Sequence, residues 1–217
     1  MRLCTIENGS ASFPWFREGL AEMTTTLVLI RHGEIVRPTD TSNFDSARLT
    51  DRGRAQLAVL AEHWPVDRPT VLYASPLRRA IESARVLGKA FGLPTIIKPC
   101  LREWAADVMG IPQPEYAALE ERSWADLDFV PPSGESLRMA GRRAHACVES
   151  IATAHPGETI AVGGHGTLFS LLTASLKKER PTAAYKASVG FGHAAILASG
   201  SRLRLVRDFS GYGPPVD

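Results

Sequence analysis

Short runs of consecutive apolar residues alternate along the chain with longer segments whose apolar positions recur at helical spacing. The short runs do not alternate with polar residues, which indicates strands covered on both faces, as in a parallel sheet. The longer segments carry apolar residues three or four positions apart, as Leu57, Leu60 and Ala61 do. The predicted strands cover residues 27–30, 71–74, 95–97 and 159–162.

Capping residues set the ends of the predicted helices. Thr50 is the expected N-cap of the first helix, and Gly92 is expected to end a second one that starts near Leu77. Two further helices are predicted, one from the Gly134-Glu135-Ser136 stretch to about His155 and one after Gly166 through Leu176. Strands that alternate with helices in this way are typical of a three-layer α/β/α domain with a mostly parallel central sheet.

Two regions depart from that alternation. Residues 194–198 and 203–206 are expected to form a hairpin through Gly200-Ser201. Residues 104–133 contain several prolines and aromatic side chains, which indicates an irregular excursion with short helices. We expect this excursion to form the roof of any pocket beside the sheet.

Composition excludes several classes of protein. The 217 residues are 44% hydrophobic and 22% charged, which is ordinary for a globular chain. The formal net charge of +2 does not favour nucleic-acid binding. No apolar run approaches the roughly 18 residues of a membrane span. Residues 1–23 lack the apolar core of a secretory signal and are expected to be an N-terminal extension. The extension is either loose or packed on the domain as a strap through Phe13, Trp15 and Phe16. A single catalytic domain is expected over residues 24–217.

The cysteines carry a prediction about cellular location. Cys4, Cys100 and Cys147 are odd in number and form no C-x-x-C pair, so a zinc site is not expected. We interpret them as free thiols in a reducing compartment, which favours a cytoplasmic protein.

Polar clusters follow three of the predicted strands. They are Arg31-His32-Gly33-Glu34, Ser75-Pro76-Leu77-Arg78-Arg79 and Gly164-His165-Gly166, and a later loop adds Glu103. Ligands of open α/β sheets bind beyond the carboxyl ends of the strands, so we expect these residues to converge. The sequence contains no arrangement with metal-ligand spacing and no phosphate loop of the G-x-x-x-x-G-K-[ST] type.

This set of side chains suits a phosphoryl group. Arginine binds phosphate oxygens in pairs and stays charged near neutral pH. A neutral imidazole is a nucleophile that needs no activating base, and a carboxyl group such as that of Glu103 can protonate a departing alkoxide. The expected ligand is therefore a small phosphoester, with neither nucleic acid nor a membrane as partner. Oligomeric state is not determined by the sequence.

Six ordered elements resemble the histidine phosphatase superfamily, which includes the cofactor-dependent phosphoglycerate mutases. The resemblance implies a phosphoglycerate mutase-like fold, no metal and no cofactor, with His32 as a nucleophile that forms a phosphohistidine. It implies that Arg31, Arg79 and His165 bind the phosphoryl group and that Glu103 donates the proton. Arg78 competes with Arg79, because only one of two adjacent helical residues can face the pocket. The six elements are Arg31–Glu34, the L-T-x-x-G-x-x-Q stretch at 49–56, Ser75–Ala80, Leu101-Arg102-Glu103, Gly134-Glu135-Ser136 and Gly164–Gly166.

One departure from the family pattern concerns the substrate. Many members carry an asparagine shortly after the R-H-G triplet, whereas residues 35–39 contain Arg37 and no asparagine. Arg37 is expected to substitute for it and to make the pocket more cationic.

Three functions compete. The first is a phosphomonoesterase that acts on small phosphorylated metabolites. The second is a phosphoglycerate mutase, which in this family has a longer segment between the acid and the second histidine to keep water out. His165 comes only 62 positions after Glu103 here, so hydrolysis is favoured. The third is a catalytically silent module that binds phosphorylated ligands or proteins, which is disfavoured because the nucleophile, acid and arginines are all present.

Overall fold

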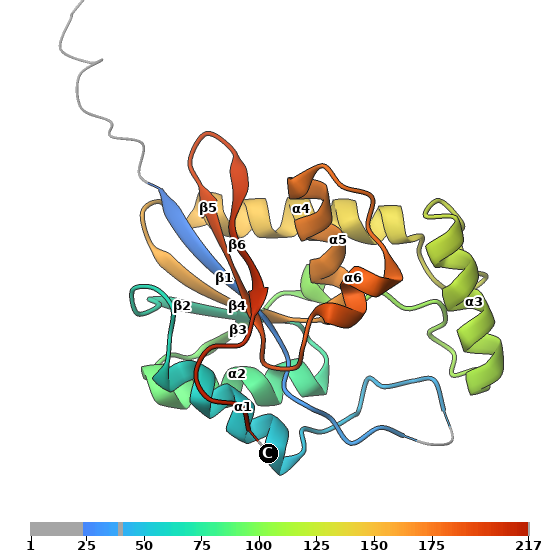
Figure 1. Ribbon diagram of the computed structural model, residues 1–217, viewed down its shortest axis with the longest axis horizontal. Coiled ribbons are helices and arrows are strands. Elements are labelled where there is room, and N and C mark those ends of the chain that lie inside the picture. Colours follow the sequence, from blue (N-terminus) through green and yellow to red (C-terminus); the bar gives the residue numbers. More distant parts are fainter. Residues whose placement is uncertain (1–23, 39–40, 217) are drawn as a thin grey trace, which may run out of the picture.

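A computed structural model describes residues 24–38 and 41–216 (Figure 1). The expected extension over residues 1–23, with its three aromatic side chains, lies outside the described residues. In chain order the elements are β1 (Thr25–Arg31), α1 (Asp51–Glu62), β2 (Val71–Ala74), α2 (Arg78–Phe91), β3 (Thr95–Ile97), the 3-10 helix η2 (Pro99–Leu101), α3 (Gln113–Ala125), α4 (Leu137–Ala154), β4 (Thr159–Gly164), α5 (Gly166–Lys177), α6 (Ala183–Ser188), β5 (Ala194–Ser199) and β6 (Leu203–Ser210).

The six strands form one sheet in the order β3-β2-β4-β1-β5-β6. The four strands from β3 to β1 run parallel, while β5 pairs antiparallel with β1 and β6 antiparallel with β5. The predicted mostly parallel sheet and its C-terminal hairpin are therefore confirmed. Register pairs Arg31 with Gly164 and Ala74 with Gly163, so three neighbouring strands end at the same edge of the sheet.

Helices cover both faces of the sheet, as the unbroken apolar runs predict (Figure 1). Val28 and Ile30 of β1 pack in the core that includes α1 and α2. Leu27 and Leu29, which point to the opposite face because side chains alternate along a strand, pack with residues of α4 and α5. Burial on both faces is why β1 carries no polar residue between Leu27 and Ile30, and the three-layer α/β/α architecture follows from it.

The capping predictions hold, whereas the prediction for the excursion is partly wrong. The side chains of Thr50 and Ser136 accept hydrogen bonds from the backbone of α1 and α4, and Gly92 ends α2 in the left-handed conformation. The excursion contains one 13-residue helix, α3, in place of several short ones. This helix stands apart from the others at one side of the molecule in Figure 1. The sequence analysis also missed α6, a helix of 6 residues whose N-cap is Thr182.

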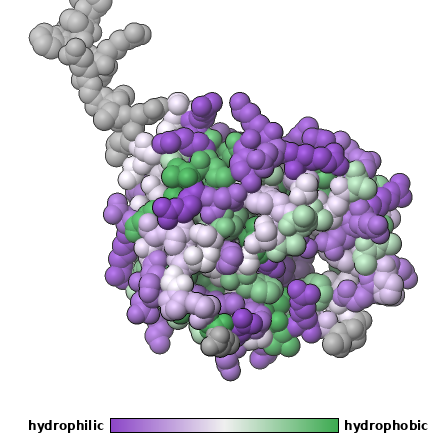
Figure 2. All heavy atoms as spheres, in the orientation of Figure 1, coloured by the Kyte–Doolittle hydropathy of each residue, from purple (hydrophilic) through white to green (hydrophobic). Residues whose placement is uncertain are grey.

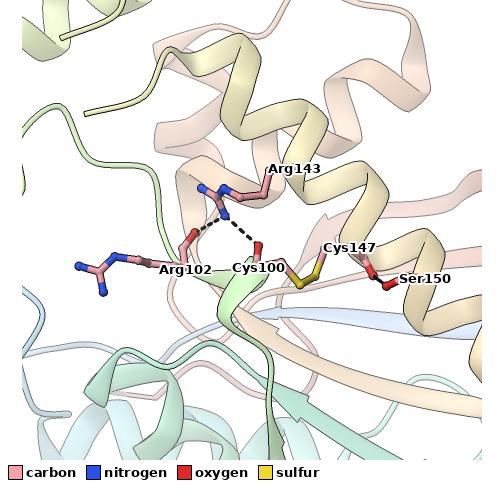
Figure 3. The surroundings of a disulfide bond; sticks show 5 residues. All are labelled: Cys100, Arg102, Arg143, Cys147 and Ser150. Carbon is pink, nitrogen blue, oxygen red and sulfur yellow. Dashed lines mark hydrogen bonds between the residues drawn. A yellow bond between two sulfur atoms is a disulfide. The ribbon is translucent and has the colours of Figure 1, made fainter. Parts of the chain in front are cut away.

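The interpretation of all cysteines as free thiols is wrong for two of them. Cys100 and Cys147 form a disulfide with their Cα atoms 5.8 Å apart, a separation within the usual range for such bonds (Figure 3). The bond joins the segment before Glu103 to α4, and sequence spacing gave no sign of it because the two residues meet only in the folded chain. Cys4 lies outside the described residues, and the cysteines no longer support the predicted cytoplasmic location.

The surface shows no extended apolar belt on the face drawn in Figure 2, where hydrophilic and hydrophobic side chains are mixed. Among the described helices, none is long and apolar enough to cross a membrane.

Candidate active site

His32 follows β1 directly and is 5% exposed. Its backbone N–H donates to the carbonyl of Gly164 on the neighbouring strand, at 3.0 Å. Its ring Nδ1 lies 2.8 Å from the carbonyl oxygen of Gly33, which can only accept, so Nδ1 carries the proton. Burial, with Arg79 next in importance, holds the pKa of His32 well below 6.5. The ring is therefore neutral at neutral pH and has its lone pair on Nε2.

The turn after His32 is held by the first turns of α1. A Cβ atom added to Gly33 would lie 2.2 Å from the carbonyl oxygen of Gly53, so the two backbones touch where only glycine fits. The side-chain oxygen of Gln56 accepts from the backbone N–H of Glu34 at 2.9 Å, and the Thr50 hydroxyl donates to the Glu34 carboxylate at 2.8 Å. Through these contacts the stretch at residues 49–56 fixes the direction of the turn that follows His32.

Two arginines lie beside His32, the half-buried Arg31 and the buried Arg79. Arg31 donates to the carbonyl oxygen of Val189, and its guanidinium carbon lies 4.1 Å from the centre of the Phe191 ring. The Nε of Arg31 is buried and has no hydrogen-bond partner among the described residues, which is unusual for a protein interior. Arg79, 6% exposed, donates from Nη1 to the carbonyl oxygen of Phe44 at 2.6 Å. Both side chains have donors available for an anion.

Arg78 takes a different direction from Arg79. Its Nε donates to the Glu82 carboxylate at 2.9 Å, one turn further along α2, and its side chain is 43% exposed. Arg78 is not among the residues that line the cavity beside His32, whereas Arg79 is. The helical geometry thus separates the two competing arginines, with one in the site and one on the surface.

The His165 ring lies next to that of His32, with the two ring centres 5.4 Å apart. Its Nε2 is 2.6 Å from the Ser75 hydroxyl, and its buried Nδ1 has no hydrogen-bond partner among the described residues. Burial, then the positive charge of Arg79, holds the pKa of His165 well below 6.5. Ser75, His165 and His32 follow three neighbouring strands, so the sheet itself brings them together.

Glu103 is held at the start of α5. Its two carboxylate oxygens accept from the backbone N–H groups of Thr167 and Leu168, at 3.0 and 2.8 Å. The segment that carries it is fixed to α4 by the Cys100–Cys147 disulfide and by Arg143, whose Nη1 donates to the carbonyl oxygens of Cys100 and Arg102, both at 2.8 Å (Figure 3). A loop glutamate thereby gains a defined position.

These residues surround a cavity of about 260 Å³. Five of the predicted site residues line it, namely Arg31, His32, Arg37, Arg79 and Glu103. The buried His165, whose ring is next to that of His32, and the exposed Arg78 do not line it. A larger hollow of about 480 Å³ lies between α4 and α5, but its charged side chains are mostly exposed and it lies away from both histidines. The smaller cavity therefore has the chemistry of an active site.

The excursion supplies cavity residues that the sequence analysis did not single out. Gln113, Tyr116 and Glu120 come from α3, and Lys186 comes from α6. Burial raises the pKa of Tyr116 to about 12, so its phenol stays protonated. Their spacing on α3 is that of one helix face, but nothing in the sequence shows which face meets the strand ends. Among residues 24–38 and 41–216, no cluster of three or more His, Cys, Asp or Glu side chains could hold a metal ion.

Comparisons with known proteins of related sequence and with solved structures point to one family. The family model described as histidine phosphatase superfamily (branch 1) matches residues 27–201. The chain is 29% identical over 167 residues to the metal-independent phosphoserine phosphatase of Arabidopsis thaliana. The aligned region covers 71% of this chain and 70% of that protein. It is 30% identical over 190 residues to the glucosyl-3-phosphoglycerate phosphatase of Mycobacterium tuberculosis, covering 78% and 82% of the two chains. A solved structure of the mycobacterial glucosyl-3-phosphoglycerate phosphatase with VO3 superposes with a TM-score of 0.68 at 27% identity, over 87% of this chain and 99% of that one.

Proposed function

Because the chain belongs to the histidine phosphatase superfamily (branch 1) and is a phosphatase of small phosphorylated metabolites, we propose that it hydrolyses phosphomonoesters without a metal ion, through a phosphohistidine on His32. The observation that carries the proposal is the state of the His32 ring. Its Nδ1–H is bound to Gly33, which leaves the Nε2 lone pair for the cavity in which Arg31 and Arg79 lie.

In the first step, Nε2 of His32 attacks phosphorus and the bond from phosphorus to the leaving oxygen breaks. Glu103 gives its proton to that oxygen, so an alcohol departs. The guanidinium groups of Arg31 and Arg79 offset the charge on the phosphoryl oxygens, a task that other enzymes give to Mg²⁺. The Nδ1 proton stays on the ring, and the Gly33 carbonyl stabilises the positive charge that the ring gains.

In the second step, water attacks phosphorus and the P–N bond breaks. The Glu103 carboxylate takes the proton from that water, and inorganic phosphate leaves. His32 returns to its neutral form with the lone pair again on Nε2, so the cycle closes. We assign to His165, whose Nδ1 has no hydrogen-bond partner among the described residues, the role of contacting a phosphoryl oxygen in both steps.

The test is to trap the intermediate. The protein is mixed with phosphomonoesters labelled with ³²P, quenched in alkali and digested, and we expect base-stable, acid-labile label on the peptide that contains His32. His32→Ala should lose both the label and at least about 10³-fold of the turnover, because the variant lacks the imidazole that forms the covalent intermediate. His145→Asn, which changes an α4 histidine outside the cavity, is the matched control and should keep both.

Two outcomes would overturn the proposal. Turnover by His32→Ala above a few per cent of the wild-type rate would exclude the covalent route. Absence of turnover on a broad panel of phosphorylated metabolites, with binding retained, would favour a silent binding module. A phosphoglycerate mutase is distinguished by its product, because ³¹P spectra of 3-phosphoglycerate would show a second phosphoglycerate in place of inorganic phosphate.

A further inference from the structure

Residues 189–193, which connect α6 to β5, form a turn that contacts both Arg31 and His32. The Val189 carbonyl oxygen accepts from the Arg31 guanidinium. The centre of the Phe191 ring lies 4.1 Å from the guanidinium carbon of Arg31 and 5.5 Å from the centre of the His32 ring. The mechanism above needs the Arg31 guanidinium in the cavity, so this turn helps to decide where that guanidinium lies.

The side chain of His193 closes the turn. The Gly190 N–H donates to Nδ1 of the His193 ring at 3.1 Å, and the His193 N–H donates to the Gly190 carbonyl oxygen at 3.3 Å. The ring also covers Gly190 so closely that a Cβ atom added there would lie 2.5 Å from Nε2. Nδ1 accepts a hydrogen bond only when it carries no proton, so the imidazole is neutral and has its proton on Nε2.

The backbone of the same residue fixes the turn to the end of β1. The Arg31 N–H donates to the His193 carbonyl oxygen at 3.0 Å, and the Gly192 N–H donates to the His32 carbonyl oxygen at 3.3 Å. His193 therefore joins the turn to β1 through its backbone and closes the turn through its ring. Loss of the ring contact should shift the Val189 carbonyl oxygen, and with it the guanidinium that this oxygen holds.

The surroundings of His193 favour its neutral form. Burial, then the positive charge of Arg31, lowers the pKa of His193 from 6.5. Among the described residues, Arg31 on β1 is the charged group that acts on the ring, and the segment after β6 faces it with the uncharged Gly211. A protonated ring would point an N–H at the N–H of Gly190, so the hydrogen bond that closes the turn would be lost.

We propose that His193 is a positioning residue for phosphate binding, because its neutral imidazole closes the turn of residues 189–193 and thereby holds the Arg31 guanidinium in the cavity. The proposal rests on the function proposed above, in which Arg31 binds the phosphoryl group. His193 does not line the cavity beside His32, so it acts through Arg31 and not by touching the substrate.

The experiment measures the Kd of inorganic phosphate by isothermal titration calorimetry, which requires no turnover. His193→Leu has no acceptor for the Gly190 N–H, and we expect it to raise Kd about tenfold at pH 8. His193→Asn places an amide oxygen near the position of Nδ1, and its Kd should stay within about threefold of the wild-type value. His145→Leu, on α4 and outside the cavity beside His32, is the matched control and should leave Kd unchanged.

A second set of measurements tests whether His193 acts through Arg31. In an Arg31→Gln background, adding His193→Leu should change Kd by no more than about twofold, because the group that His193 positions is already absent. The ratio of the wild-type Kd to that of His193→Asn should rise as the pH falls from 8 to 5. The imidazole loses its acceptor on protonation and the amide does not, whereas the titration of phosphate itself affects both proteins equally.

The failures of the two proposals are distinguishable. If folded His193→Leu binds phosphate as tightly as the wild type, or if its loss is undiminished in the Arg31→Gln background, the positioning role is wrong and the phosphatase mechanism stands. Circular dichroism establishes folding, and if His193→Leu does not fold, a wild-type to His193→Asn ratio that is constant with pH overturns the role. Turnover that survives His32→Ala overturns the mechanism alone. A wild-type protein that neither binds phosphate nor hydrolyses phosphoesters overturns both.

Discussion

The cavity has a floor and a wall that are built differently. The floor consists of Arg31, His32 and His165 at the ends of β1 and β4, with Arg79 in the first turn of α2. The wall consists of Gln113, Tyr116 and Glu120 on α3 with Lys186 on α6. The histidines of the floor are 5% and 0% exposed. In the wall, the Glu120–Lys186 ion pair has side chains 30% and 31% exposed.

The floor and the wall differ in how firmly the rest of the fold holds them. Three of the floor residues, Arg31, His32 and His165, lie at the ends of strands whose backbones are hydrogen-bonded to one another, so a shift of one would disturb the sheet. Arg79 lies in the first turn of α2, and its side chain is buried. In α3 the only described residue that is fully buried is Ser123, so this helix contributes little to the core. Precise chemistry is placed on rigid elements and selectivity on segments that can vary at small cost to stability. The phosphoryl-transfer residues should therefore tolerate no change, while the wall should alter which substrate is accepted.

The largest effect should come from the two adjacent arginines, one in the floor and one outside it. Arg79→Gln should lower kcat/KM for any phosphomonoester by about 10³-fold or more, because it removes a charge that stabilises the transferred phosphoryl group. Arg78→Gln should stay within about twofold, since it breaks only an exposed pair with Glu82. Steady-state kinetics checks this, with circular dichroism to establish that Arg79→Gln is folded. Equal losses in the two variants would contradict the separation that α2 imposes.

A smaller loss of activity is expected when the proton donor Glu103 is changed than when a phosphate-binding arginine is changed. Glu103→Gln should lower kcat by about 10²-fold for alkyl phosphates, because an alkoxide is a poor leaving group without a proton donor. The loss should shrink to a few-fold with p-nitrophenyl phosphate, whose leaving group departs readily as an anion. Rapid-quench measurement of the first turnover with each substrate tests this. A loss of the same size for both substrates would show that Glu103 acts by positioning α5 and not by proton transfer.

The floor was predictable from the sequence because its signals are local. A short apolar run followed by Arg31 and His32 indicates a buried strand that ends in polar groups, and Ser75 and His165 repeat that pattern. Strand neighbours then converge by the geometry of a parallel sheet. The choice between Arg78 and Arg79 needed the structure, since it depends on the rotation of α2 relative to the sheet.

The wall and the disulfide were not predictable in the same way. Gln113, Tyr116 and Glu120 lie on a helix with little buried apolar surface, so periodicity gives no face to assign. Lys186 belongs to α6, which is too short to produce a pattern. The pairing of Cys100 with Cys147 depends on where η2 meets α4, a contact between segments far apart in the chain. In each case the missing information is long-range packing.

The smallest effect concerns the stability of the floor as pH falls. Burial holds the pKa of His32 and His165 well below 6.5 in the folded protein, whereas both have a pKa near 6.5 when the chain is unfolded. Below pH 6.5 the unfolded chain therefore binds more protons than the folded one, and each histidine lowers the free energy of unfolding by up to about 1.4 kcal/mol per pH unit. The half-buried wall has no histidine among its four residues and should contribute nothing to this slope. Urea unfolding at pH 7, 6 and 5 measures it, and His165→Asn should remove about half of the part due to the two rings. His145→Asn, outside the cavity, is the control and should leave the slope nearly unchanged. If His165→Asn kept the full wild-type dependence of unfolding free energy on pH, the buried imidazole would not be held neutral. Burial would then not distinguish the floor from the wall.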